Sequence, residues 1–144
     1  MSLPLALWDS SALIPLCVTQ PQSKTAESLF KKYKVVAWWA TEVEIRSGLV
    51  RLVRLGSIPQ SQFQAAKGLA AKLVSGWVSA HESTAIANSA CSLLEVHPLR
   101  AADALQLAAA FEVCEHSPRG FVFVTGDQRL AEAARASGFT VELV

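Results

Sequence analysis

Continuous apolar runs recur along the chain, and each is short enough to be a β-strand. The clearest is Phe-Val-Phe-Val-Thr at residues 121–125, which lies between Gly120 and Gly126. Apolar residues in these runs do not alternate with polar ones, so both faces of each strand are expected to be buried, as in a parallel sheet covered by helices. The predicted strands span residues 5–8, 35–38, 76–79, 121–125 and 140–144.

Segments with helical spacing of their apolar residues separate these strands. Pro21 and Pro59 are placed to begin helices, and Gly56 and Gly138 are placed to end them. The predicted helices span residues 12–18, 21–30, 41–55, 59–73, 83–94, 100–114 and 128–136, the last capped by Asp127. Strands that alternate with helices predict an α/β fold, a three-layer sandwich with a parallel central sheet.

The composition agrees with one folded unit. A length of 144 residues predicts a single domain spanning residues 1–144. With 51% apolar and only 17% charged residues, the chain is not disordered and carries no charged tail. The net charge of +1 excludes a protein that coats nucleic acid through overall basicity. The apolar excess also favours a surface covered by a partner or by a second copy of the chain.

Nothing in the sequence indicates a disulfide scaffold, a zinc module or a membrane segment. The three cysteines, Cys17, Cys91 and Cys114, are far apart and are not paired with histidines at metal-ligand spacing. The apolar N-terminus meets Asp9 too early for a signal peptide, and no run reaches about 18 apolar residues. We therefore expect a cytoplasmic protein.

Carboxylates fall where a parallel sheet would bring them together. Asp9 and Asp127 follow predicted strands, and Asp103 is the only other aspartate in the chain. Ligands of open parallel sheets bind beyond the carboxyl ends of the strands, so residues at these ends are expected to share one crevice. Glu44 and Asp103 lie in the first turns of their predicted helices and can project into the same crevice.

Helix capping is the competing interpretation for each of these four residues. Acidic side chains are favoured at helix N-termini, and Thr41-x-x-Glu44 matches a capping box with Thr41 as the N-cap. Four converging carboxylates without basic partners would, however, repel one another and raise one another's pKa. A divalent cation relieves that repulsion, and an all-oxygen site selects Mg²⁺ or Mn²⁺. The pattern therefore favours metal-assisted phosphodiester hydrolysis.

Four segments spaced along the chain carry a family resemblance. They span residues 7–14, 44–49, 99–108 and 122–130, and they include Leu-Trp-Asp-Ser-Ser at 7–11 and Val-Thr-Gly-Asp at 124–127. In this order and spacing the chain resembles, nearly from end to end, the PIN-domain ribonucleases, specifically the VapC toxins of bacterial VapBC toxin–antitoxin pairs. One departure is Gln106, which stands where many relatives carry His.

The resemblance implies a PIN-like fold and a Mg²⁺- or Mn²⁺-dependent endoribonuclease that cleaves single-stranded or structured RNA. The catalytic and metal-binding residues that it implies are Asp9, Glu44, Asp103 and Asp127. Ser10 and Thr125 are expected to support this acidic quartet with their hydroxyls. The resemblance also implies a VapB-like antitoxin as partner, assembly as a homodimer and RNA as the substrate.

Further charged residues lie near the quartet in the sequence. Glu42 also lies near the second predicted strand, but Glu44 is the one followed by the Ile-x-x-Gly-Leu pattern, so we prefer Glu44. Arg46, Arg100 and Arg129 each lie two or three residues from a proposed ligand and are candidates to contact the scissile phosphate.

The rival interpretation is a PIN-like fold that has become a non-catalytic binding module. The intact quartet disfavours it, and a module of that kind should bind Mn²⁺ poorly.

Two other folds with carboxylates at strand ends are excluded by absent residues. A receiver domain needs a lysine after a late strand, but no lysine follows Lys72. A haloacid-dehalogenase-type phosphatase needs a second Asp where Ser11 stands.

Overall fold

The computed structural model describes residues 2–144, in which strands and helices alternate as expected. The strands are β1 (Leu5–Trp8), β2 (Lys34–Trp38), β3 (Val78–Ala80), β4 (Val122–Thr125) and β5 (Thr140–Leu143). The helices are α1 (Ser10–Leu13), α2 (Ser23–Phe30), α3 (Thr41–Arg54), α4 (Gln60–Gly76), α5 (Thr84–Val96), α6 (Ala101–Val113) and α7 (Gln128–Ala136), and a 3₁₀ turn, η1 (Ile14–Leu16), follows α1.

All five strands are parallel and lie in the order β3-β2-β1-β4-β5. The central strand is β1, in which Ala6 pairs with Val35 of β2 on one side and with Val122 of β4 on the other. The chain first builds the sheet outward from β1 to β3 and then crosses to β4 on the opposite side of β1. The strand order therefore reverses beside β1, which is where open parallel sheets bind their ligands.

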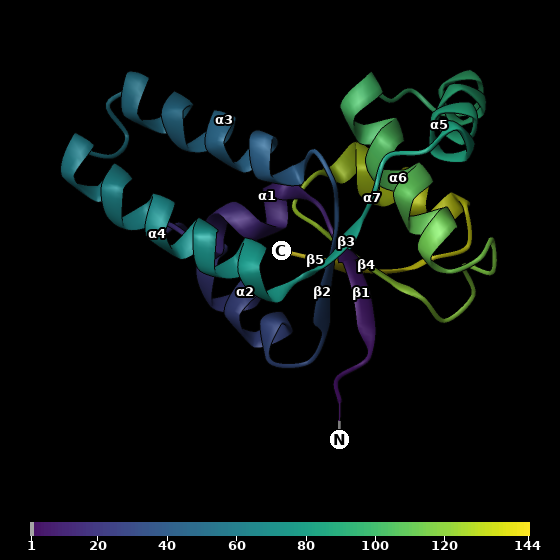
Figure 1. Ribbon diagram of the computed structural model, residues 1–144, viewed down its shortest axis with the longest axis horizontal. Helices are drawn as coiled ribbons and strands as arrows, with labels where there is room; N and C mark the ends of the chain where they lie inside the picture. The colour runs from purple at the N-terminus through teal and green to yellow at the C-terminus, as the bar shows by residue number, and fades with distance from the viewer. Residues whose placement is uncertain (1) are drawn as a thin grey trace.

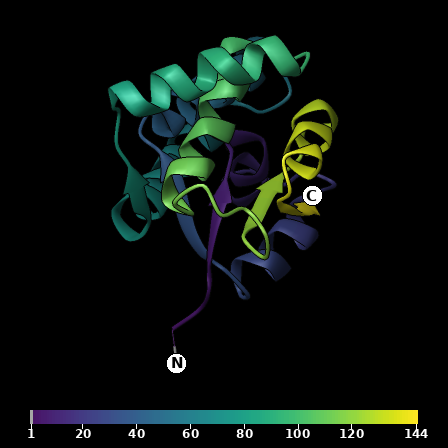
Figure 2. The ribbon, with the colours of Figure 1, turned by 90° about the vertical axis from the view of Figure 1, so that its right-hand side faces the viewer.

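Helices cover both faces of this sheet (Figures 1 and 2). Ala6 and Trp8 of β1 pack into a core with α3 residues such as Leu49, whereas Leu7 faces a second core with α6 residues such as Leu107. In Figure 1, α3 and α4 lie to one side of the strands and α5 and α6 to the other. The predicted three-layer α/β sandwich is confirmed. Within residues 2–144, no helix has the length and apolar character needed to cross a membrane.

Several predicted elements have different bounds in the structure, and two of these differences have a clear physical cause. The helix expected over residues 12–18 begins earlier, at Ser10, and gives way to the 3₁₀ turn η1, which contains Pro15. Proline has no backbone N–H to continue an α-helix, so the tighter turn replaces the second half. The strand expected over residues 76–79 is displaced to Val78–Ala80 because α4 continues to Gly76 and the pairing with β2 sets the start of the strand.

A glycine in the middle of α3 allows this helix to pack closely on η1. A Cβ atom at Gly48 would overlap the Cδ1 end of the Ile14 side chain, so a larger residue would force Ile14 to repack. Ile45 and Leu49 on the same side of α3 are buried in the core. This packing holds the N-terminal turn of α3 at the carboxyl edge of the sheet.

Candidate active site at the carboxyl edge of the sheet

Asp9 occupies the end of the central strand and is almost fully buried, with 4% of its surface exposed. Its backbone N–H donates to the carbonyl oxygen of Val124 at 3.2 Å, which ties the end of β1 to β4. The Ser11 Oγ lies 2.7 and 2.9 Å from the two carboxylate oxygens of Asp9. Burial raises the pKa of Asp9 to about 7, although the hydroxyls of Ser11 and Thr125 act to lower it.

A pair of hydroxyls joins the ends of β1 and β4. The Ser11 Oγ accepts from the backbone N–H of Gly126 at 2.8 Å and lies 3.3 Å from the Thr125 Oγ1. The Thr125 Oγ1 in turn accepts from the backbone N–H of Asp127 at 3.0 Å. Glycine at 126 eases this approach, because a Cβ there would lie 3.3 Å from the Ser11 carbonyl oxygen, a tight contact. Thr125 thus links the ends of β1 and β4 through backbone and hydroxyl contacts.

Ser11 is the site residue that sequence reasoning missed. The serine expected to support the quartet was Ser10, whose Oγ lies 3.4 Å from Glu44 Oε1, a long hydrogen bond. Ser11 makes the shorter bonds, and it makes them to Asp9. Two adjacent serines after an aspartate signal a helix start, but the signal does not say which hydroxyl turns back to the carboxylate.

Asp127 is a helix cap as well as a candidate ligand. Its Oδ1 accepts from the backbone N–H groups of Arg129 and Leu130 at 2.9 and 3.1 Å, at the start of α7. Both bonds use Oδ1, so capping leaves the second oxygen, Oδ2, for another role. The two interpretations that compete for this residue in the sequence are therefore compatible in the structure.

Glu44 belongs to no capping box, so the structure removes the competing capping interpretation for this residue. The N-cap of α3 is Ala40, and Thr41 is already helical and fully buried. The Gln106 side-chain nitrogen Nε2 donates to both Thr41 Oγ1 at 3.0 Å and Glu44 Oε2 at 3.1 Å. These hydrogen bonds between α6 and α3 take the place of the local cap. Burial raises the pKa of Glu44, whereas its hydrogen bond from Gln106 lowers that pKa.

Asp103 is the carboxylate through which the other three are electrostatically linked. It lies in the first turn of α6, where partial burial raises its pKa and the negative charge of Asp127 raises it further. The charge of Asp103 in turn raises the pKa of both Asp9 and Glu44. The structure thus brings the four predicted carboxylates into one electrostatically coupled group centred on Asp103.

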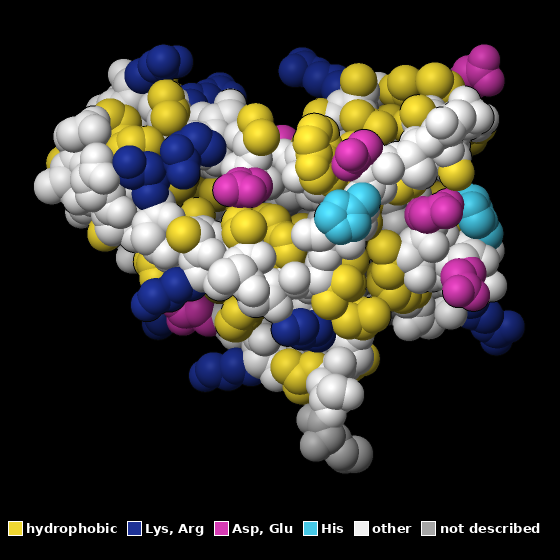
Figure 3. Space-filling model, viewed as in Figure 1, with side chains coloured by type: hydrophobic (Ala, Val, Ile, Leu, Met, Phe, Trp, Pro, Cys, Tyr) yellow, Lys and Arg dark blue, Asp and Glu magenta, His cyan; other side chains and the backbone are white. Residues whose placement is uncertain are grey.

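Two of the three candidate arginines lie beside this group. Arg100 and Arg129 line a hollow of about 530 Å³ together with Asp103 and Asp127. The positive charges of both arginines lower the pKa of Asp103. Figure 3 shows the surface hollowed between the side that carries α3 and α4 and the side that carries α5 and α6. Cationic groups at this edge are placed to bind an anion next to the carboxylates.

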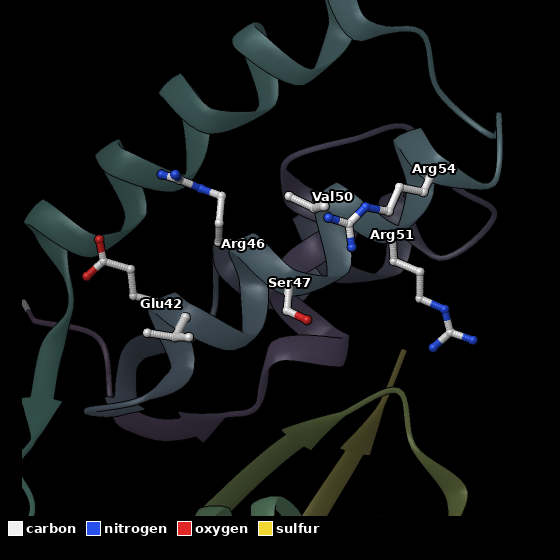
Figure 4. A pocket seen from close by; sticks show the side chains of 7 residues that line it. Glu42, Arg46, Ser47, Val50, Arg51 and Arg54 are labelled. Carbon is white, nitrogen blue, oxygen red and sulfur yellow. The ribbon is translucent and has the colours of Figure 1, made fainter.

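Arg46 and Glu42 lie elsewhere, on the outward face of α3. They line a different hollow, of about 660 Å³, together with Val50, Arg51 and Arg54 (Figure 4). None of the four quartet residues lines this hollow. The structure therefore separates Arg46 from the other two arginines and separates Glu42 from the carboxylate group.

The donor chemistry of the quartet fits a hard divalent cation. All four side chains offer carboxylate oxygens, and within residues 2–144 no Lys or Arg nitrogen lies within 4.0 Å of any of them. A bound cation would neutralise the negative charges that raise the pKa of Asp9, Glu44 and Asp103. As the side chains stand, residues 2–144 hold no group of three or more His, Cys, Asp or Glu side chains close enough together to bind a metal ion.

Comparison with solved structures identifies the fold. PAE2754 from Pyrobaculum aerophilum matches with a TM-score of 0.67 and 21% identity, covering 96% of this chain and 89% of that one. The sarcin-ricin loop cleaving toxin VapC20 from Mycobacterium tuberculosis matches with a TM-score of 0.66 and 17% identity, covering 94% and 96% of the two chains. VapBC2 from Rickettsia felis, solved with a DNA fragment from its promoter, matches with a TM-score of 0.66 and 12% identity, covering 97% and 98%.

The chain has the PIN-like α/β fold, as the sequence resemblance predicted. Solved structures that share it include VapC-type toxins and toxin–antitoxin complexes, and the matches run over nearly the whole of each chain. No family model matches the sequence, and no curated protein matches it either. With identities of 21% and below, the likeness establishes the fold, and the activity has to be argued from the site.

Proposed function

We propose that this protein is a Mg²⁺- or Mn²⁺-dependent endoribonuclease and the toxin of a VapBC-type toxin–antitoxin pair. The observation that carries the proposal is the group of four coupled carboxylates at the point beside β1 where the strand order reverses. The same fold occurs in a toxin that cleaves the sarcin-ricin loop, which supports RNA as the substrate class.

In this proposal the quartet holds the metal ion, which supplies a water of lowered pKa and neutralises charge that develops on the phosphate. The remaining steps belong to the chain's own residues. Arg100 and Arg129 bind and orient the phosphate from the hollow beside Asp103. Ser11 holds the carboxylate of Asp9 through contacts to both of its oxygens. Burial of Asp9 keeps water from competing for that carboxylate.

Chelation of divalent cations is the direct test of the proposal. The purified protein is expected to cleave RNA with Mg²⁺ or Mn²⁺ and to stop in EDTA, because the coupled carboxylates cannot all remain ionised around a phosphate without a cation. Cleavage products are followed on a denaturing gel, and excess Mg²⁺ should restore them. Cleavage that continues unchanged in EDTA, by protein free of contaminating ribonuclease, would refute the proposal.

Titration with Mn²⁺, together with the cleavage assay, separates the proposal from its rival, a non-catalytic PIN-like binding module. Such a module can bind RNA through the Arg100 and Arg129 hollow without any metal. It should show neither Mn²⁺ binding in calorimetry nor product formation. The structure favours the enzyme because the carboxylates are partly desolvated and close enough to raise one another's pKa, an arrangement that RNA binding alone does not need.

The proposal includes a VapB-like antitoxin as partner, a homodimer as the assembly and the cytoplasm as the compartment. Several large apolar side chains are exposed, among them Trp39 at 57%, Val43 at 69% and Val96 at 74%. Burial of such side chains in an interface stabilises an assembly by the hydrophobic effect. Light scattering at micromolar concentration is expected to give the mass of a dimer, and a clean monomer would contradict this part of the proposal.

A further inference from the structure

The side chain of Gln106 links the two helices that carry Glu44 and Asp103. Gln106 lies on α6 three residues after Asp103, so both project from the same face of that helix. Its side chain is completely buried, although glutamine is a residue type found mostly on protein surfaces. Nε2 donates to Thr41 Oγ1 at 3.0 Å and to Glu44 Oε2 at 3.1 Å, both on α3.

Chemistry settles the orientation of this amide. Its NH₂ group has two hydrogens, and the two oxygens of Thr41 and Glu44 accept both of them. The reversed orientation would place the amide oxygen against the Glu44 carboxylate, where two acceptors repel each other. The amide is therefore a donor toward Glu44.

The other end of the amide shows that packing alone does not explain this residue. Gln106 Oε1 is buried without a hydrogen-bond partner among the described residues. An unpartnered buried carbonyl destabilises a fold, and a leucine of similar size would fill the same space in the helix without that cost. The donation to Glu44 is the contact that a leucine cannot make.

We propose that Gln106 is a positioning residue that fixes the side chain of Glu44 for metal binding. The inference rests on the proposed function, since it assigns a role to Gln106 within the same site. Glu44 projects from the first turn of α3, and its only other side-chain hydrogen bond in the described structure is the long one from Ser10, at 3.4 Å to Oε1. Without Gln106 the carboxylate would be free to rotate away from the charges of Asp103 and the rest of the group.

Thr41 serves as the anchor of this arrangement. It is fully buried, and its hydroxyl holds the same nitrogen that donates to Glu44. Thr41 itself makes no hydrogen bond to any of the four carboxylates. A substitution that removes the Thr41 hydroxyl therefore takes a hydrogen bond from Gln106 and none from a carboxylate, which makes it a second probe of the same role.

The experiment compares Gln106→Leu, Gln106→Glu and Gln106→His in the full chain. Calorimetric titration with Mn²⁺ and the kcat and KM of RNA cleavage are measured for each variant. Gln106→Leu is expected to weaken Mn²⁺ binding about 10- to 100-fold and to lower kcat by a similar factor, with little change in the KM for RNA. Gln106→Glu, which keeps the shape but places a second carboxyl against Glu44, should also weaken Mn²⁺ binding, because the two carboxyls either repel each other or share a proton. Gln106→His restores an N–H donor and should recover most of the Mn²⁺ affinity.

Matched controls separate positioning from a general loss of structure. Gln64→Leu makes the same chemical change on an exposed face of α4 and should alter neither Mn²⁺ binding nor kcat. Thr41→Val should weaken Mn²⁺ binding and Thr41→Ser should not, because only the hydroxyl anchors Gln106. Glu44→Gln removes this ligand altogether. Its loss of Mn²⁺ affinity and kcat is the reference for the smaller losses expected of the Gln106 variants. The melting temperature of Gln106→Leu should equal or exceed that of the wild type.

The outcomes distinguish this inference from the proposed function beneath it. A wild-type protein that neither binds Mn²⁺ nor cleaves RNA overturns both. A wild type that does both, with a folded Gln106→Leu variant of equal Mn²⁺ affinity and kcat, overturns the role of Gln106 alone. If Gln106→Leu does not fold, the comparison of Thr41→Val with Thr41→Ser decides: equal Mn²⁺ affinity for these two variants overturns the inference.

Discussion

Replacement of Asp103 by Asn is expected to lower kcat for RNA cleavage by at least about 10²-fold, the usual effect of removing one preorganised charge from a reaction centre. Asp103 is chosen because its charge raises the pKa of Asp9 and Glu44, and its own pKa is raised by the charge of Asp127. Asparagine keeps the size of the side chain and removes the charge, so cation binding and the support of a charged transition state are lost together. RNA binding should persist, because Arg100 and Arg129 are unchanged.

The control for Asp103→Asn is Glu132→Gln, which removes an exposed carboxylate from α7. The kcat of that variant should match the wild type. Binding of RNA to Asp103→Asn, followed by fluorescence anisotropy, shows whether the defect lies in chemistry or in affinity. Cleavage by Asp103→Asn within a few fold of the wild type would mean that Asp103 is only a first-turn helix residue, as the capping interpretation holds.

The second large effect concerns stability in the absence of metal. Asp9 has a pKa of about 7 in the folded protein against 3.8 in a model compound. Between these values the unfolded chain releases its proton while the folded chain keeps it, so the free energy of unfolding falls as pH rises from about 4 to 7. A shift of this size corresponds to about 4 kcal/mol of lost stability at pH 8. Glu44 and Asp103 act in the same direction, since their pKa values are also raised.

Asp9→Asn should therefore be more stable than the wild type at pH 8 in EDTA, and about equally stable near pH 4. Urea unfolding at both pH values measures the difference. Mg²⁺ should stabilise the wild type at pH 8 and have a much smaller effect on the variant, because the ion compensates the buried charge that the variant lacks. Lower stability of Asp9→Asn at pH 8 would show that the carboxylate is satisfied by Ser11 without a cation.

The fold follows from the sequence because its signals are local and repeated. Buried parallel strands need continuous apolar runs such as 121–125, and helices between them need apolar residues at helical spacing. These patterns are properties of neighbouring residues, so they survive without tertiary information. The two bounds that differ most clearly from the prediction have different causes, one a tertiary pairing and one a local proline. Pairing with β2 placed β3 at Val78–Ala80, and Pro15 divided the first helical segment.

The members of the site were also accessible to sequence reasoning, because parallel strands end at one edge of the sheet. Asp9 and Asp127 were placed there by the strands before them, and Glu44 and Asp103 by the first turns of their helices. What remained undetermined was which neighbour of each residue faces the same way. Ser10 and Ser11, like Glu42 and Glu44, are alternatives that only the phase of a helix against the sheet can separate.

The sequence by itself determined the layers of this protein, the parallel sheet and the four carboxylates at its edge, since each depends on strand ends and helix starts. Only the tertiary structure decided how those carboxylates are held. Thr41 and Glu44 form no local cap. Instead, both accept hydrogen bonds from Gln106 on α6, which lies 62 residues after Glu44 in the sequence. The contact exists because α3 and α6, which cover opposite faces of the sheet, meet at its carboxyl edge, and spacing within one helix carries no information about such a meeting.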